Sequence, residues 1–317
     1  MGRGLMPQAG QPLTPASRSP PGGGRVAVAA SGRRGHIDAM PGQAARPTVE
    51  IPRSVYRERP PPPALAGRVL CVWSQMIGDG TAELRHRVLP DGCIDIVWIG
   101  DAPAVVAGPA TGPVLVPLAP RTTVVGLRLR PGAVPGLLGA PASELLNRDT
   151  PLGELWGAAG DALSARVGEE VALAAKLNAA AAAFAPHLAG AGPPDPMIAA
   201  ATLWLARHPA GRIADLCRLL EVGERRLRRR FAAAIGYGPK TFQRVLRLQR
   251  VLALAGRLPR TGTTLAGLAA EAGYADQAHM SRELQALTGR SPAALLESAA
   301  STLEMSDFFK TAGGAAA

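Results

Sequence analysis

The sequence predicts an α+β multidomain chain: a β-rich small barrel or sandwich with appended helices, followed by an all-α double helix-turn-helix unit. Three observations predict this fold. Short apolar segments separated by Asp-Gly, Gly-Asp and Gly-Pro turns fill residues 54–130. A Gly- and Pro-rich break, GAGPPDP, covers 190–196. Beyond it the apolar spacing is helical to about residue 299, and one two-helix pattern occurs there twice.

The β-rich prediction rests on segments with alternating or continuous apolar residues. They cover 68–73, 83–90, 93–100, 104–108, 114–120 and 122–132. Within the last of them, Leu127 and Leu129 point to one face of a strand, and Arg128 and Arg130 point to the other. Helical pieces are expected at 132–139, 141–147 and 151–157, and one or two helices at 159–188. Many short strands at this spacing are typical of a small antiparallel barrel or sandwich.

The chain therefore divides into five parts. We expect a disordered extension at 1–48, because its Gly, Pro, Ser and Arg residues cannot bury enough apolar surface. Met40 is an alternative start of translation. A β-rich sensing or dimerisation domain with C-terminal helices follows at 49–189, and then a linker at 190–197. The all-α unit covers 198–299, and a tail covers 300–317.

Charge is distributed unevenly along the 317 residues, whose formal net charge is +11. Residues 1–48 carry +5, 49–200 carry −2, 201–300 carry +9 and 301–317 carry −1. A strongly basic C-terminal unit beside a near-neutral central domain indicates that the former binds a polyanion.

Three cysteines far apart in the sequence form neither a disulfide framework nor a CxxC zinc set. No apolar run reaches the ~18 residues of a membrane span, and the first residues lack the apolar region of a signal peptide. We expect a cytoplasmic protein.

The central domain offers few residues for catalysis or metal binding. Cys93 lies beside Asp91 and Asp95, whose charges disfavour a thiolate, so a buried structural cysteine is expected. No HxH or paired His-Glu pattern accompanies His86, so an ordinary strand histidine is expected. No GxSxG, P-loop or GxGxxG pattern occurs in a suitable context. We expect no catalytic residue, metal or cofactor, and we expect that the chain is not an enzyme.

The first two-helix pattern contains GERRLRRRF at 223–231, with five arginines in nine positions. Before it, an apolar stripe at i, i+3, i+4 and i+7 predicts a short amphipathic helix over 213–220. Residues 221–223 break that helix. Leu227 and Phe231 then predict the buried face of a second helix, whose other faces carry the arginines.

The second pattern, at 264–284, repeats the first at an offset of 52 to 53 residues. Gly273 ends its first helix, Asp276 is placed to cap the next helix, and Met280 and Leu284 form the buried pair. Between the two patterns, residues 240–255 predict one helix about 24 Å long. A spacer of this length suits two recognition helices separated by one DNA turn of about 34 Å.

Residues 198–298 resemble the AraC/XylS family of transcription regulators. The motifs RRLRRRF, GYGPKTFQRVLRLQR, LAAEAGYADQAHMSREL and TGRSPAAL stand in the family's order and spacing. The resemblance implies two helix-turn-helix motifs that enter successive major grooves. This sequence departs from the family at Gly223, where a serine cap is usual, and at Leu284, where phenylalanine is common. PPPALAGRVLCVW, VLPDGCIDIVW and LRLRPGAVPGLLGAPASEL resemble a poorly characterised N-terminal domain often attached to such regulators.

The predicted recognition helices supply the candidate DNA-binding residues. Arg225, Arg228 and Arg229 share a face away from Leu227, and arginine suits bidentate contact with guanine. Arg226 and Arg230 lie on the flanks, where phosphate or solvent is expected.

The remaining candidates lie at helix starts and on the second recognition helix. Lys240 lies in the first turn of the linking helix, where a phosphate could bind. By resemblance, Gln277 and Arg282 match groove-facing positions. His279 is equally expected to contact the DNA backbone or to face solvent.

These features predict a sequence-specific regulator that binds double-stranded DNA and is modulated through its N-terminal domain. Two alternatives stay open: a DNA-tethered enzyme with its chemistry in the N-terminal domain, and a non-specific architectural DNA binder. RNA polymerase, a small-molecule effector and a second copy of the chain are further partners that the sequence allows.

Overall fold

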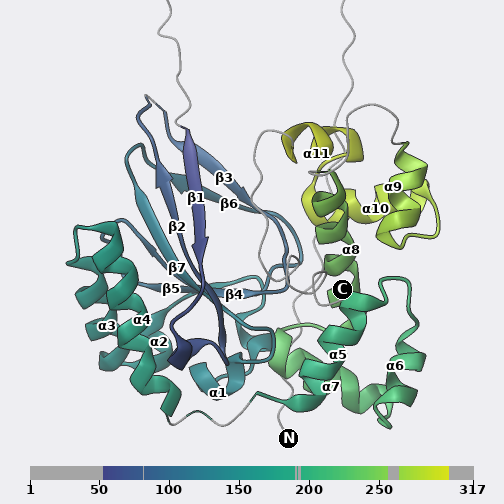
Figure 1. The fold of residues 1–317 in the computed structure, drawn as a ribbon, viewed down its shortest axis with the longest axis horizontal. Coiled ribbons are helices and arrows are strands. Elements are labelled where there is room, and N and C mark those ends of the chain that lie inside the picture. The colour runs from purple at the N-terminus through teal and green to yellow at the C-terminus, as the bar shows by residue number, and fades with distance from the viewer. Residues whose placement is uncertain (1–52, 81, 190, 192–193, 256–263, 300–317) are drawn as a thin grey trace, which may run out of the picture. The chain divides into compact units, whose positions relative to one another are not determined.

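The computed structural model describes residues 53–80, 82–189, 191, 194–255 and 264–299 (Figure 1). All of these residues belong to one compact unit, Thr48–Ala317. The extension expected at 1–48 and the tail expected at 300–317 lie outside the described residues, as does part of the linker expected at 190–197.

The strands form two antiparallel sheets (Figure 1). The larger sheet has the order β1 (Ser54–Arg59), β2 (Val69–Ile77), β7 (Thr123–Leu129), β4 (Ile94–Ile99), β5 (Val105–Ala107) and β8 (Asp149–Pro151). The smaller sheet pairs β3 (Leu84–Val88) with β6 (Val114–Leu118). The sheets are not closed, so the barrel alternative is wrong and a two-sheet arrangement is present. Each of the six predicted segments overlaps one strand, although β2 runs beyond the predicted 68–73, and β1 and β8 are additional.

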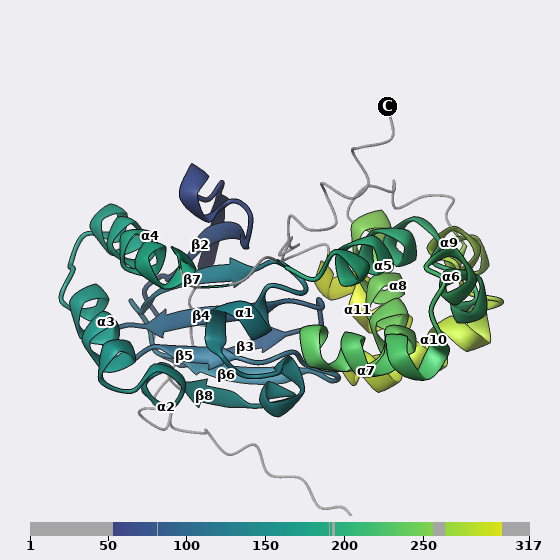
Figure 2. The ribbon, with the colours of Figure 1, turned by 90° about the horizontal axis from the view of Figure 1, so that it is seen from below.

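Helices cover one face of the larger sheet. They are η1 (Pro63–Leu65), α1 (Val134–Leu138), η2 (Ala142–Leu145), α2 (Leu152–Trp156), α3 (Ala158–Gly168) and α4 (Leu173–Ala189). α3 and α4 lie side by side (Figure 2). Leu127, Trp98 and Phe184 are fully buried in the core between sheet and helices. The segment predicted as a helix at 141–147 is a short 3-10 turn.

The opposite face of the sheet packs against β3 and β6. Cys71, Trp73 and Leu118 form the centre of this second core. Gly126 of β7 lies directly under the Trp73 ring: a Cβ there would come within 2.3 Å of Trp73 Cε2. Glycine is therefore required at this strand position by close approach, not by its backbone conformation.

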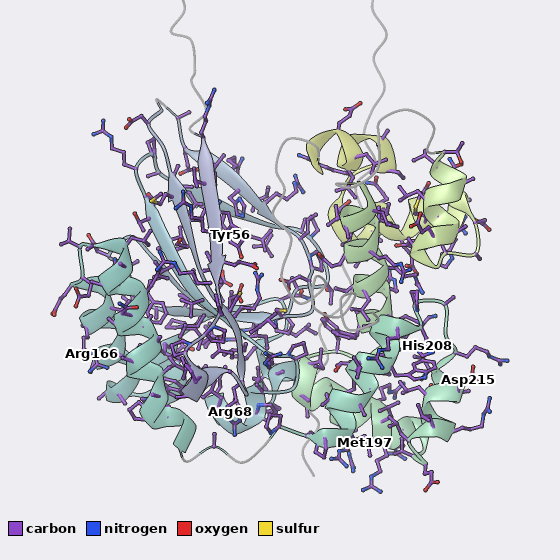
Figure 3. The ribbon with its side chains drawn as sticks, viewed as in Figure 1. Tyr56, Arg68, Arg166, Met197, His208 and Asp215 are labelled. Atoms are coloured by element: carbon purple, nitrogen blue, oxygen red, sulfur yellow. The ribbon has the colours of Figure 1, made fainter. Side chains whose placement is uncertain are left out.

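A buried ionic cluster lies on this second face, near Tyr56 of β1 (labelled in Figure 3). Arg128 is 9% exposed and lies 3.3 Å from Glu58, 3.4 Å from Asp91 and 3.0 Å from Asp95. The alternation expected along β7 is confirmed, because Leu127 and Leu129 face the helices while Arg128 faces away from them. Three acids around one buried guanidinium satisfy its charge.

After the β-rich domain the chain is helical, and its helices share one core. They are α5 (Pro196–Arg207), α6 (Ile213–Leu219), α7 (Glu224–Ile235), α8 (Pro239–Ala255), α9 (Leu265–Ala272), α10 (Gln277–Thr288) and α11 (Pro292–Ala299). Figure 1 shows α8 with α5 and α7 towards one end and α9, α10 and α11 towards the other, and it contacts all five helices. Within the described part of the chain, no helix is long and apolar enough to cross a membrane.

Replacing Arg128 tests how much the buried cluster contributes to stability. We expect Arg128→Ala to lower the free energy of unfolding by about 3–5 kcal/mol, because it leaves buried carboxylates without their counter-charge. Urea unfolding at pH 7 measures the change. Arg166→Ala, at an exposed position of α3, is the control and should change it by less than about 0.5 kcal/mol. Equal losses in the two variants would contradict a stabilising role for the cluster.

Candidate nucleic-acid interface

α6, a short turn and α7 form the first helix-turn-helix motif. Leu216 of α6 packs in the core with Leu227 and Phe231 of α7, all three fully buried. Glu221 in the turn has φ 51°, and Gly223 precedes α7 in an extended conformation, with no side-chain cap. The predicted break at 221–223 is confirmed. Because Leu227 and Phe231 hold one face of α7 inward, the rest of the helix surface faces away from the core.

That outer surface of α7 carries four exposed arginines: Arg225, Arg226, Arg228 and Arg229. The fifth has another role. Arg230 Nη2 lies 2.7 Å from Asp195 Oδ2, and Asp195 is the N-cap residue of α5. The expectation that Arg230 meets phosphate or solvent is wrong, because this ion pair joins α7 to the start of α5. Four arginines, not five, are presented outward.

α9 and α10 form the second motif, and both helices are capped. Thr264 Oγ1 accepts a hydrogen bond from the Gly267 backbone N–H at the start of α9, and Gly273 ends α9 with φ 87°. Asp276 Oδ1 accepts from the His279 N–H at 2.6 Å and begins α10. Met280 and Leu284 are fully buried. Every element of the predicted second motif is therefore present.

The predicted site residues of α10 differ in exposure. Gln277 and Arg282 are exposed. His279 is only partly exposed: its Nε2 lies 3.1 Å from Glu283 Oε1, and its Nδ1 is 3.4 Å from the Ala275 N–H. Both ring nitrogens of His279 therefore have partners inside the protein. The sequence had predicted that this residue contacts either the DNA backbone or solvent.

The first turn of α8 presents Lys240. Its side chain is exposed, and Nζ lies 3.2 Å from Gln243 Oε1. Gln243 is fully buried and donates through Nε2 to the Gly211 carbonyl oxygen at 2.7 Å, just before α6. This bond ties the start of α8 to the start of the first motif.

A buried group of ion pairs at the centre of the unit was not predicted from the sequence. It consists of Glu283, Arg247, Arg244 and His279, and we call it the joint. Glu283 of α10 accepts from Arg247 of α8 at 2.6 Å and lies 3.4 Å from Arg244 Nε. Burial raises the pKa of Glu283, but hydrogen bonds and charge from Arg247, with His279 and Arg244, outweigh burial and hold this pKa below its ordinary value. Arg247 lies between Leu246 and Leu248 in a helix rich in arginine, so nothing in its spacing distinguishes it from a solvent-facing residue.

Two family models match separate stretches of the chain. Residues 216–298 match a family described as a helix-turn-helix domain, and residues 57–151 match a domain of unknown function, DUF6597. No curated protein sequence matches the chain.

Among solved structures, the chain is similar to ToxT from Vibrio cholerae. An apo point variant of ToxT is 12% identical over 72% of this chain and 96% of that chain, with a TM-score of 0.39. Wild-type ToxT bound to an unsaturated fatty acid is 12% identical over 78% of this chain and 95% of that chain, with a TM-score of 0.38. Likeness at this level gives no information on a ligand of this chain.

Two helix-turn-helix motifs on one core, exposed arginines on the first recognition helix and the family match together define a DNA-binding transcription regulator. More narrowly, the tandem motifs joined by one long helix make the helical unit similar to AraC-family regulators.

The lowered pKa of Glu283 predicts a pH-dependent contribution to stability. The ionised carboxylate stabilises the fold above the ordinary glutamate pKa of about 4.3, and this stabilisation is lost as pH falls through the lower pKa of the folded state. Glu283→Gln removes the titrating group. We expect the stability difference between wild type and this variant to shrink below pH 4, as measured by urea unfolding from pH 7 to pH 3.

Glu271→Gln, at an exposed position of α9, is the matched control. It should leave the pH dependence of the wild type unchanged. A difference between wild type and Glu283→Gln that stays constant down to pH 3 would show that charge at Glu283 does not matter.

Proposed function

We propose that this regulator binds double-stranded DNA sequence-specifically, with α7 and α10 in successive major grooves, and that its β-rich domain modulates this binding. The observation that carries the proposal is the pair of recognition helices, each held by a buried i, i+4 pair, on opposite ends of α8. α8 has 17 residues and is about 26 Å long. Such a spacer suits grooves one DNA turn, about 34 Å, apart.

The outer surface of α7 supports base reading by the first motif. Arg225, Arg228 and Arg229 stand at i, i+3 and i+4 and are exposed, and each has the fork geometry that pairs with guanine O6 and N7. We assign these three to the groove. Arg226 and Lys240 are assigned to phosphates, which position the protein without reading sequence.

The second motif has a less charged surface. We assign Gln277 and Arg282 of α10 to its groove, since both are exposed at the start and middle of the helix. Glutamine can read adenine in a bidentate manner. Because α7 carries more positive charge, the first motif should supply more of the salt-dependent affinity.

The alternative of an enzyme tethered to DNA would need reactive groups in the β-rich domain. Acids do converge there, at Glu58, Asp91 and Asp95, but they converge on the Arg128 guanidinium. Burial, followed by the charge of Asp91, raises the pKa of the Cys93 thiol and so disfavours a nucleophile. These observations favour a structural role for the cluster, and we propose a regulator without catalytic activity.

Modulation by the β-rich domain is supported by a turn that contacts α8. The Pro90 carbonyl oxygen accepts a 2.7 Å hydrogen bond from the buried Gln249 side chain of α8. Gly92 has φ 79°, and a Cβ there would come within 2.6 Å of Phe242 Cε2. Asp91, between these two contacts, is ion-paired with Arg128. A rearrangement at the ionic cluster would therefore move a turn that touches the helix between the two motifs.

Three kinds of partner could trigger such a rearrangement. A small-molecule effector, RNA polymerase or a second copy of the chain could each supply it by binding one arrangement of the turn more tightly than another.

Base reading by α7 is tested on the best duplex selected by the wild-type chain from randomised DNA. We expect Arg229→Ala to weaken binding to that duplex by about 1–3 kcal/mol and to relax the preference at one base pair. Arg226→Ala should weaken binding to all duplexes alike and reduce the salt slope by about one. Fluorescence anisotropy across a set of single-base-pair variants, at several salt concentrations, separates the two effects.

Two outcomes would count against this assignment. If Arg229→Ala weakens every duplex equally, α7 contacts only the backbone. If the wild type selects no preferred duplex at all, the non-specific architectural alternative holds.

Modulation through the turn is tested with a pair of glycine variants. Gly92 and Gly100 both have positive φ, at 79° and 59°, so alanine strains the backbone at either position. Only at Gly92 would the new Cβ meet Phe242, since nothing lies within 4 Å at Gly100. We expect Gly92→Ala to change the affinity for the selected duplex at least threefold and Gly100→Ala to leave it unchanged. Equal effects of the two variants on affinity would exclude coupling through this turn.

A further inference from the structure

Arg247, in the middle of α8, is the most buried charged side chain of the helical unit that the structure describes. Its side chain is 3% exposed. A buried guanidinium is costly unless all its donors and its charge are satisfied. A position that keeps such a group inside an apolar core needs a physical reason, and its contacts supply one.

The first set of contacts joins Arg247 to the second motif. Its Nη2 lies 2.6 Å from Glu283 Oε1 and 2.7 Å from Oε2, and its Nε lies 3.3 Å from Oε2. Its guanidinium carbon lies 5.1 Å from the centre of the Tyr274 ring, in the turn between α9 and α10. The guanidinium therefore contacts the second motif in two ways, through hydrogen bonds to Glu283 and through the Tyr274 ring.

The remaining side of the guanidinium joins Arg247 to the turn between α5 and α6, which leads into the first motif. Its Nη1 donates to the Pro209 carbonyl oxygen at 3.2 Å. Pro209 follows His208, labelled in Figure 3, in the turn between α5 and α6. The second motif touches this turn, since a Cβ on Gly273 would come within 2.8 Å of Pro209 Cβ. One side chain of α8 thus bonds to the second motif and to the turn that leads into the first motif.

We infer that Arg247 is a positioning residue that sets the orientation of the first motif relative to the second, and thereby the base-pair spacing at which both recognition helices can bind. This inference rests on the proposed function. The guanidinium is planar and its donors have fixed directions, so its bonds to Glu283 and Pro209 constrain angles as well as distances. A lysine ammonium would keep the charge and lose this geometry.

Glu283 extends the joint to the DNA-facing side of α10. The His279 ring accepts at Nδ1 from the Ala275 N–H, which leaves Nε2 to carry the proton that Glu283 accepts. With both nitrogens engaged, His279 supports the start of α10 and does not read a base. It is therefore assigned to the joint, while Gln277 and Arg282 face outward.

The test measures spacing discrimination with the full-length chain. The probe is the best duplex selected by the wild type from randomised DNA, compared with the same duplex carrying one base pair more or fewer between its half-sites. One base pair rotates a half-site by about 34° and shifts it by about 3.4 Å. We expect the wild type to lose about tenfold or more in affinity on either change.

We expect Arg247→Gln and Arg247→Lys to bind the original duplex more weakly but to discriminate between spacings less than threefold. Glu283→Gln, which keeps the shape of the acceptor, should give an intermediate loss of discrimination. It also provides the test if the Arg247 variants fail to fold.

Ile198→Ala is the stability-matched control, because Ile198 is fully buried in the same core and takes no part in the joint. It should lower the unfolding temperature while keeping the wild-type ratio of affinities between spacings. That ratio is a readout that a general loss of stability does not move.

The outcomes separate the two ideas. If the wild type selects no preferred duplex, the proposed function fails and this inference falls with it. If it does select one, and Arg247→Gln and Glu283→Gln keep the wild-type discrimination between spacings, the proposed function stands and Arg247 does not set the spacing. A single-base change in preference caused by His279→Gln would overturn the assignment of His279 to the joint.

Discussion

The packing of α8 against both helix-turn-helix motifs is the constraint on which the rest of the helical unit depends. Phe242, Val245 and Leu248 are fully buried on different sides of this helix, because it contacts α5 and α7 as well as α9, α10 and α11. Each motif alone consists of two short helices that cannot bury their own apolar faces. By burying both, α8 makes one core of two motifs and gives each recognition helix a fixed base.

Charge is used in two opposite ways in this chain. Arg128 and Arg247 are buried and surrounded by carboxylates and carbonyl oxygens, so their charge is neutralised within the protein. The exposed arginines of α7 have no such arrangement, and they give the unit its attraction for a polyanion. Arginine abundance in the sequence therefore does not measure the strength of the DNA-binding surface. The partners of each guanidinium decide its role.

The two recognition helices also begin differently. α10 starts at an aspartate that caps it, whereas α7 starts at Gly223 without a side-chain cap. The uncapped N–H groups of α7 and its arginines place more positive potential at the first motif than at the second. This asymmetry agrees with a first motif that supplies more of the salt-dependent affinity.

Much of the helical unit could be predicted from its sequence, because apolar spacing, Gly273 and Asp276 are local signals that keep their meaning in the folded chain. The sequence by itself determined the two motifs, the linking helix, and Leu227 and Phe231 as the buried face of α7. Only the tertiary structure decided that Arg230 pairs with Asp195, that Arg247 joins the second motif to the turn before the first, that His279 is engaged by Glu283, and that the two sheets stay open. The physical reason is that helix periodicity depends on neighbours three and four residues away, whereas Arg230 and Arg247 pair with acids 35 and 36 residues distant. His279 lies only four residues from Glu283, but Glu283 is itself held by Arg247.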